Sequence, residues 1–263
     1  TSTKQTYLGD IVVMAGTGSS LVSVLATDAT PSLVGHWKMD ESTGSLIDDA
    51  SAFNNDGTAL NSPTFVEGVY GNSIQLNGTN QYASVPDNSS LDISGAITLA
   101  AWIKPEKKGT QRILFKVSGT AGYELFLEDP DPSRVSARFN GNASYRVNST
   151  TSYVSYLDSW IHIAVTYDGT TAKLYFNGQP EGTNTQSFSI GGTSTSLGIG
   201  ANPSLSNFFQ GSIDDARIYN RALTADEIVV LATRPPTEAP AAPELSSPAD
   251  MATNILINPT LIW

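Results

Sequence analysis

Hydrophobic and polar residues alternate in short runs through the centre of this chain. Gly122–Glu128 alternates with the period of two that is typical of a half-buried strand. Ala96–Ile103 is apolar on both faces, as a strand inside a sandwich is expected to be. Trp160–Tyr167 and Ala172–Phe176 are two further strand-like runs. The pattern therefore predicts many short strands joined by polar turns.

The residues between these runs indicate how the strands connect. Asp168-Gly169 and Asn177-Gly178 supply the positive-φ positions of tight hairpins. A single helix is expected at Thr224–Leu231, because Thr224 and Glu227 stand in the spacing of a capping box. Strands at such regular spacing predict an all-β fold: a two-sheet antiparallel jelly-roll sandwich with one short C-terminal helix.

The composition changes along the chain and suggests four segments. Residues 33–233 carry the strand pattern and form the expected jelly roll. Residues 1–32 hold two short strand-like runs and are either the tail of a preceding domain or an added hairpin. Residues 234–244 are proline-rich, which predicts a semi-rigid linker. Residues 245–263 resemble the first strand of a fibronectin type III or immunoglobulin-like domain, so we expect a piece of a longer protein.

Charge and composition narrow the classes of function. The chain has 263 residues and a net charge of −11, with 14 Lys+Arg that form no basic run, so we expect no nucleic-acid partner. It has no cysteine, which excludes disulfides and thiol chemistry. No apolar stretch of about 18 residues is present, so no membrane insertion is expected. Only 15% of residues are charged, which suits an extracellular or cell-surface module.

Several short motifs follow one another in a fixed order. They are His36–Glu41, Asn55–Thr58, Leu76–Pro86, Thr98–Pro105, Trp160–Gly169, Leu174–Gly178 and the closing string Gly211–Leu223. In this order they closely resemble the laminin G-like jelly rolls of the concanavalin A-like lectin/glucanase superfamily. The resemblance implies two antiparallel sheets, one of them concave, with ligands bound on the concave face or at the rim loops.

The resemblance also raises the question of glycoside hydrolysis, which needs two carboxylates held close together. Glu124 and Glu128 share one face of a strand, but they lack the central aspartate of the glucanase pattern. We interpret them as solvated acids on an outer face. His36 and His162 fit core or interface positions. We therefore expect no enzyme, and a polysaccharide-cleaving activity is a minor alternative.

A structural calcium ion is implied by the resemblance. Related jelly rolls hold it with the aspartate that opens a D-x-x-R-x-Y strand, which is Asp214 here, and with backbone carbonyls. Asp40 and the Asp56-Gly57 turn are the expected neighbours. The alternative is that Asp214 accepts hydrogen bonds from a loop backbone with no ion. Asp215 lies on the opposite face beside Arg217, where an ion pair is expected.

Glycan binding needs exposed aromatic rings flanked by hydrogen-bonding side chains. Tyr123, Arg138 and Tyr145 fall in a polar, loop-rich part of the chain and are the candidate ligand-binding residues. The alternative is that these aromatic rings belong to the core.

The function expected from these features is a non-catalytic extracellular binding or adhesion module, for a glycan or a surface protein, within a larger surface protein. The alternative is a structural subunit of a surface layer or extracellular filament. In that case the strand-like segments at the two ends self-assemble by strand exchange with neighbouring copies.

Overall fold

The structure, a computed structural model, describes residues 14–15, 22–23, 32–129, 132–202, 204 and 206–233. Near the N-terminus, strands β1 (Met14–Ala15) and β2 (Val22–Ser23) pair antiparallel, within or beside the two strand-like runs of that segment. The rest of residues 1–31, and the expected linker and domain start at 234–244 and 245–263, lie outside the described residues.

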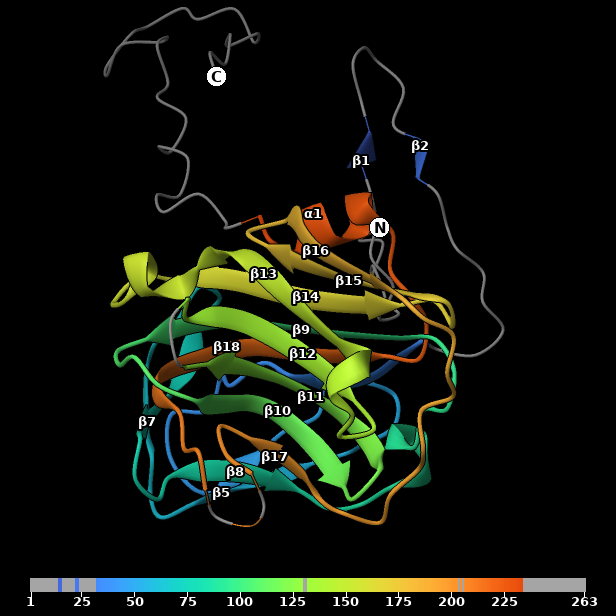
Figure 1. The fold of residues 1–263 in the computed structure, drawn as a ribbon. Helices are drawn as coiled ribbons and strands as arrows, with labels where there is room; N and C mark the ends of the chain where they lie inside the picture. Colours follow the sequence, from blue (N-terminus) through green and yellow to red (C-terminus); the bar gives the residue numbers. More distant parts are fainter. Residues whose placement is uncertain are drawn as a thin grey trace, which may run out of the picture. The chain divides into compact units, whose positions relative to one another are not determined.

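The main body is a sandwich of two antiparallel sheets (Figure 1). The sheet drawn toward the viewer, here the front sheet, has the order β13-β12-β11-β10-β17-β8-β5-β4. Its strands are β4 (Leu46–Ile47), β5 (Gly57–Leu60), β8 (Tyr82–Val85), β10 (Gln111–Ser118), β11 (Ala121–Glu128), β12 (Arg134–Phe139), β13 (Arg146–Ser152) and β17 (Leu197–Ile199).

The other sheet, here the back sheet, has the order β16-β15-β14-β9-β18-β7-β6, and β3 pairs with β18 beside it. Its strands are β3 (Leu33–Trp37), β6 (Thr64–Glu67), β7 (Asn72–Asn77), β9 (Ile97–Pro105), β14 (Ile161–Tyr167), β15 (Thr171–Phe176), β16 (Gln179–Thr185) and β18 (Gln210–Tyr219). Short 3-10 turns lie at η1 (Ser89–Leu91), η2 (Ala143–Tyr145) and η3 (Tyr153–Tyr156), and the helix is α1 (Ala225–Leu231).

The predicted all-β sandwich with one short C-terminal helix is confirmed. Strand β9 shows why the hydrophobic pattern of the sequence predicted a buried strand correctly. This strand lies in the middle of the back sheet, between β14 and β18. Leu99 and Ile103 point into the main core between the sheets, whereas Ala100 points outward into a second cluster beneath α1. Because both of its faces are covered, the strand reads as a continuous apolar run.

The predicted hairpin turns are also present. Asn177 and Gly178 have φ of 49° and 77° between β15 and β16, which matches the positive-φ pair that such a turn requires. Between β14 and β15 only Gly169 of the expected Asp168-Gly169 pair has positive φ, at 95°. Asp168 instead stabilises the turn through its side chain, whose Oδ1 accepts the backbone N–H groups of Thr170 and Thr171 at 2.8 Å.

Helix α1 begins with the predicted capping box. The Thr224 hydroxyl accepts the N–H of Glu227 at 3.3 Å, and the Glu227 carboxylate accepts the N–H of Thr224 at 2.7 Å. Ile228 and Leu231 then pack onto the outward side of the back sheet. Within the described part of the chain, no helix is long and apolar enough to cross a lipid bilayer.

Replacing Thr224 with alanine is expected to lower the free energy of unfolding by about 1 kcal/mol, because the hydroxyl cap is lost. The measurement is a urea denaturation curve. The control is Thr120→Ala, which removes an exposed hydroxyl in the turn between β10 and β11. Equal midpoints for the two variants would show that the cap does not stabilise the helix.

Candidate functional site

The outward surface of the front sheet carries a cluster of charged side chains around one aromatic ring. We name it the arginine cluster, and its members are Arg112 on β10, Glu124, Phe126 and Glu128 on β11, Arg138 on β12 and Arg146 on β13. Strand register brings them together, because Glu124 stands opposite Arg138, and Arg138 stands opposite Arg146.

Both carboxylates of the cluster face guanidinium groups. Glu124 is fully buried, and its Oε1 accepts the N–H of Arg138 Nε at 2.5 Å, while its Oε2 lies 3.1 Å from Arg112 Nε. Glu128 Oε1 accepts from Arg146 Nη1 at 2.5 Å. The interpretation as solvated acids on an outer face is therefore wrong for Glu124, which is buried among guanidinium groups, whereas Glu128 lies on that face and is 26% exposed.

Phe126 lies beneath the guanidinium groups, and Arg112 is left with unmet hydrogen-bonding capacity. The guanidinium carbons of Arg112, Arg138 and Arg146 lie 4.6, 5.8 and 5.7 Å from the Phe126 ring centroid, within the range of cation–π attraction. The Arg112 side chain is 10% exposed, and its Nη1 finds no hydrogen-bond partner among the described residues. Burial lowers the pKa of Arg112, and the positive charges of Arg138 and Arg146 lower it further. The negative charge of Glu124 raises this pKa and so opposes the effect of burial.

Two half-buried aromatic rings continue the same surface beyond β17. Tyr82 on β8 alternates with the core residues Ala83 and Val85, so it points outward. Its ring centroid lies 6.1 Å from that of Phe208, at an interplanar angle of 59°. The outward surface of the front sheet thus combines cationic donors with partly exposed aromatic rings.

The structure separates the three residues expected to bind a sugar. Arg138 belongs to the arginine cluster. Tyr123 points into the core, is 1% exposed and donates its hydroxyl to the Leu91 carbonyl at 3.1 Å, so its expected role is wrong. Tyr145 is half-buried and stacks on Phe188, with ring centroids 4.0 Å apart. Of these three residues, only Arg138 lies in the cluster.

Asp214, the expected metal ligand, holds a loop through one oxygen and leaves the other unpaired. It is fully buried on β18, and its Oδ2 accepts the N–H groups of Val69 and Tyr70 at 2.6 and 3.0 Å. Its Oδ1 is buried and has no hydrogen-bond partner among the described residues. Burial raises the pKa of Asp214 to about 7, although the two N–H groups act in the opposite direction. Nearby carboxylates, including Asp40, raise it further.

Asp40 holds the same loop at another position. Its Oδ1 accepts the N–H of Asn72 at 3.0 Å. A Cβ added at Gly68 would lie 2.6 Å from both the Asn72 carbonyl oxygen and Asp214 Oδ2, so these two oxygens converge on a space that only glycine leaves open. The unpaired, buried oxygen of Asp214 is a ligand of the kind that a hard cation such as calcium takes.

Asp56 and Gly57, the other two expected metal neighbours, are engaged elsewhere. Asp56 Oδ1 accepts the N–H of Asp49 at 2.9 Å, and Gly57 lies in the front sheet opposite Ile47. The structure thus divides the expected set: only Asp40 and Asp214 share the 68–72 loop. In the described ranges, no group of three or more acidic or histidine side chains is placed to bind a metal. Other ligands to an ion would have to be backbone carbonyls or water.

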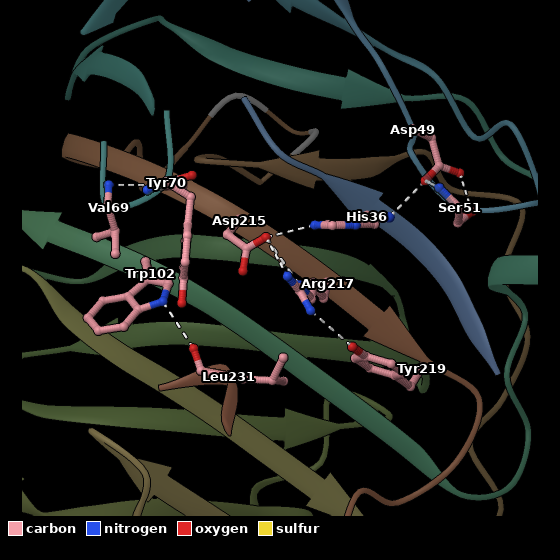
Figure 2. A network of polar contacts seen from close by, with 11 residues as sticks. His36, Asp49, Ser51, Val69, Tyr70, Trp102, Asp215, Arg217, Tyr219 and Leu231 are labelled. Carbon is pink, nitrogen blue, oxygen red and sulfur yellow. Dashed lines mark hydrogen bonds and ion pairs between the residues drawn. The ribbon is translucent and has the colours of Figure 1, made fainter. Parts of the chain in front are cut away.

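A second polar network lies on the outward side of the back sheet, beside α1 (Figure 2). Asp215 Oδ1 contacts His36 Nε2 at 2.7 Å and Arg217 Nη2 at 2.9 Å, which confirms the expected Asp215–Arg217 ion pair. Trp102 donates to the Leu231 carbonyl at 3.2 Å, which ties the sheet to the end of α1. These contacts join β3, β9, β18 and α1, so the network is structural.

The two histidines have the core and interface roles expected from the sequence. His36 is 9% exposed, and burial lowers its pKa although Asp215 opposes this effect. His162 is 2% exposed, lies edge-on to Trp102 with ring centroids 5.3 Å apart, and burial lowers its pKa to about 3. Both imidazoles are therefore expected to be neutral at pH 7.

A shallow cavity of about 320 Å³ lies between β3 and the segment around η1. Val34, Phe53, Ile93 and Ala96 form its apolar lining, and Asp92 is the single charged residue there. Asp92 Oδ1 already lies 3.4 Å from Lys116 Nζ. The cavity therefore offers a ligand fewer charged groups than the arginine cluster does.

Several solved structures share the fold. Domain 4 of AbnA, a GH43 extracellular arabinanase from Geobacillus stearothermophilus in complex with arabinotriose, is 23% identical with a TM-score of 0.61, covering 76% of this chain and 98% of that one. The binding domain of Paraclostridial Mosquitocidal Protein 1 is 19% identical with a TM-score of 0.60, over 76% and 52%. The binding domain of botulinum neurotoxin DC in complex with SialylT is 13% identical with a TM-score of 0.60, over 76% and 50%. At such low identities these similarities establish the fold alone.

Sequence comparison places the chain in a family. The Adhesion G-protein coupled receptor V1 of Danio rerio is 25% identical over 166 residues, which cover 59% of this chain and only 3% of the receptor. Residues 77–229, more than half of the 263, match the Laminin_G_3 family. With this match and the two-sheet sandwich described above, the chain belongs to the concanavalin A-like lectin/glucanases superfamily.

Proposed function

We propose that this domain is a non-catalytic binding module that holds a glycan on the outward surface of the front sheet. The observation that carries the proposal is that the arginine cluster and the Tyr82–Phe208 pair share one sheet surface, since sugars are held by hydrogen-bond donors together with apolar ring surfaces. The saccharides bound to domain 4 of AbnA and to the binding domain of neurotoxin DC support it. Ion pairing of Glu124 and Glu128 with arginines favours binding over carboxylate-pair hydrolysis.

As part of the same proposal, the domain acts outside the cell or at its surface, as one unit of a longer protein. The arabinanase that contains AbnA domain 4 is extracellular, and the curated relative is an adhesion receptor. A surface protein is the alternative ligand, since the binding domain of neurotoxin DC is also known in complex with rat synaptotagmin II. Of the terminal segments that motivated the filament alternative, only residues 14–15 and 22–23 lie within the described residues.

We further propose that Asp214 and Asp40 hold a structural calcium ion. The support is the unpaired, buried Oδ1 of Asp214 and the position of Asp40 on the same 68–72 loop. A bound cation would compensate the buried carboxylate, whose ionised form is otherwise costly in an apolar environment. It would also fasten the 68–72 loop to β18.

A glycan array probed with the purified chain, once in calcium and once in chelator, tests the glycan proposal. We expect at least one saccharide to bind, with the interaction confirmed by titration calorimetry and the bound saccharide recovered at its original length. Shortening of the saccharide would overturn the non-catalytic assignment. An array that is blank in both buffers would contradict glycan binding and leave the surface-protein alternative.

A further inference from the structure

Resting on the proposed glycan site, we infer that its ligand is an anionic saccharide, one that carries carboxylate or sulfate groups. The first reason is where the arginines lie. Of the chain's seven arginines, four lie on β10, β12 and β13, although the chain as a whole carries a net charge of −11: Arg112, Arg134, Arg138 and Arg146. Alternation on β12 places Arg134 and Arg138 on the same outward face.

The second reason is an imbalance of charge inside the cluster. The guanidinium groups of Arg112, Arg138 and Arg146 surround only two carboxylates, Glu124 and Glu128. Arg112 is nine-tenths buried, and its Nη1 finds no acceptor in the part of the chain that the structure describes. A buried cationic group without full pairing is costly, so an anion arriving at this surface would remove that cost.

The third reason is access. The side chains of Arg138 and Arg146 are 23% and 26% exposed, so a ligand at the surface can reach them. Phe126 lies beneath them and is only 2% exposed, so its ring cannot stack on a sugar. Guanidinium groups bind carboxylate and sulfate-like oxygens through two parallel hydrogen bonds. The cluster therefore recognises the anionic group, and the Tyr82–Phe208 pair lies on the same sheet surface for the sugar rings.

The acidic net charge of the chain does not oppose this assignment at short range. At physiological ionic strength, charges further apart than about 8 Å are largely screened in solvent. An anion held against Arg138 and Arg146 therefore interacts mainly with the cluster. Binding is expected to weaken as salt is raised, which is the signature of exposed guanidinium contacts.

The test compares trigalacturonate with its methyl ester, a matched pair that differs only in charge, by titration calorimetry with the full chain. We expect trigalacturonate to bind at least tenfold more tightly than the ester. Arg146→Gln should reduce that affinity at least tenfold, because it removes a guanidinium group that contacts the anion. The variant should still fold, because the Arg146–Glu128 pair is partly exposed. Lys173→Gln is the control, since it removes one positive charge from an exposed position on β15.

Further arms separate the outcomes. Glu128→Gln should bind as tightly as the wild type or more tightly, because it frees Arg146 from its competing carboxylate. Binding of a sulfated galactan in place of trigalacturonate, with the same sensitivity to Arg146→Gln, would support the inference with sulfate as the anion. If the ester binds equally and Arg146→Gln has no effect, the anionic assignment is overturned while glycan binding stands. Equal binding of polyglutamate would overturn the saccharide class, and binding of no charged or neutral saccharide would overturn both proposals.

Discussion

Replacing Glu124 with alanine is expected to lower the free energy of unfolding by about 3–5 kcal/mol, because it leaves a buried cation without its partner. Glu124 is fully buried and faces both Arg112 and Arg138. Arg112 is 10% exposed and therefore cannot turn into solvent without disturbing β10. The measurement is chemical denaturation of the wild type and the variant at pH 7.

The matched control is Glu128→Ala on the same strand. Glu128 and Arg146 are each 26% exposed, and ion pairs of this kind contribute only about 0.2–1 kcal/mol. The two substitutions remove the same group from the same face of β11, so their difference measures the effect of burial. Similar losses for the two variants would contradict the picture of a buried, ion-paired Glu124.

Stability should depend on pH and calcium through Asp214. Burial raises the pKa of Asp214 from the usual 3.8 to about 7. Between these two pH values the folded chain holds a proton that the unfolded chain has released, so without metal the stabilisation is complete below pH 3.8 and is lost as the pH rises through 7. The rise in pKa corresponds to roughly 4 kcal/mol.

Asp214→Asn isolates this contribution, because the amide stays neutral and its carbonyl oxygen can still accept from Val69 and Tyr70. In chelator, the variant should gain stability relative to the wild type as the pH rises from 4 to 8. Calcium should reverse the order at pH 8, where the wild type gains about 2.7 kcal/mol at a hundredfold excess over Kd and the variant gains nothing. Identical melting of the wild type in calcium and in chelator would refute the calcium proposal. A pH-independent difference between the two proteins would refute the raised pKa.

The contrast between Tyr123 and Glu124 shows what the alternation of a strand can reveal. Tyr123, Leu125 and Leu127 share one face of β11, and the acids share the other. The burial of Tyr123 could therefore have been predicted from the hydrophobic pattern. The ion-pair partners of Glu124 could not be predicted from that pattern. Arg112 and Arg138 lie twelve and fourteen positions away along the chain, and only the register of β10 and β12 against β11 brings them into contact.

The proposed metal site also combines residues that the sequence could name with an arrangement that it could not predict. The resemblance pointed to Asp214, which opens the closing D-x-x-R-x-Y motif, and named Asp40 as an expected neighbour. The structure shows that they share the 68–72 loop, whereas Gly57 begins a strand of the opposite sheet and Asp56 accepts from Asp49 just before it. Proximity between residues so far apart in the chain depends on the order of strands in each sheet, and no local pattern records that order.

By itself, the sequence determined the strands, the tight turns, the cap of α1 and the two-sheet class of the fold. Each of these depends on local physics: a period of two along a strand, positive φ at Asn177 and Gly178, and a hydroxyl placed before the helix at Thr224. Only the tertiary structure decided the arginine cluster, the burial of Glu124 beneath it and the loop held by Asp214. These depend on register, sheet order and the removal of charged groups from water, which arise only when the two sheets have assembled.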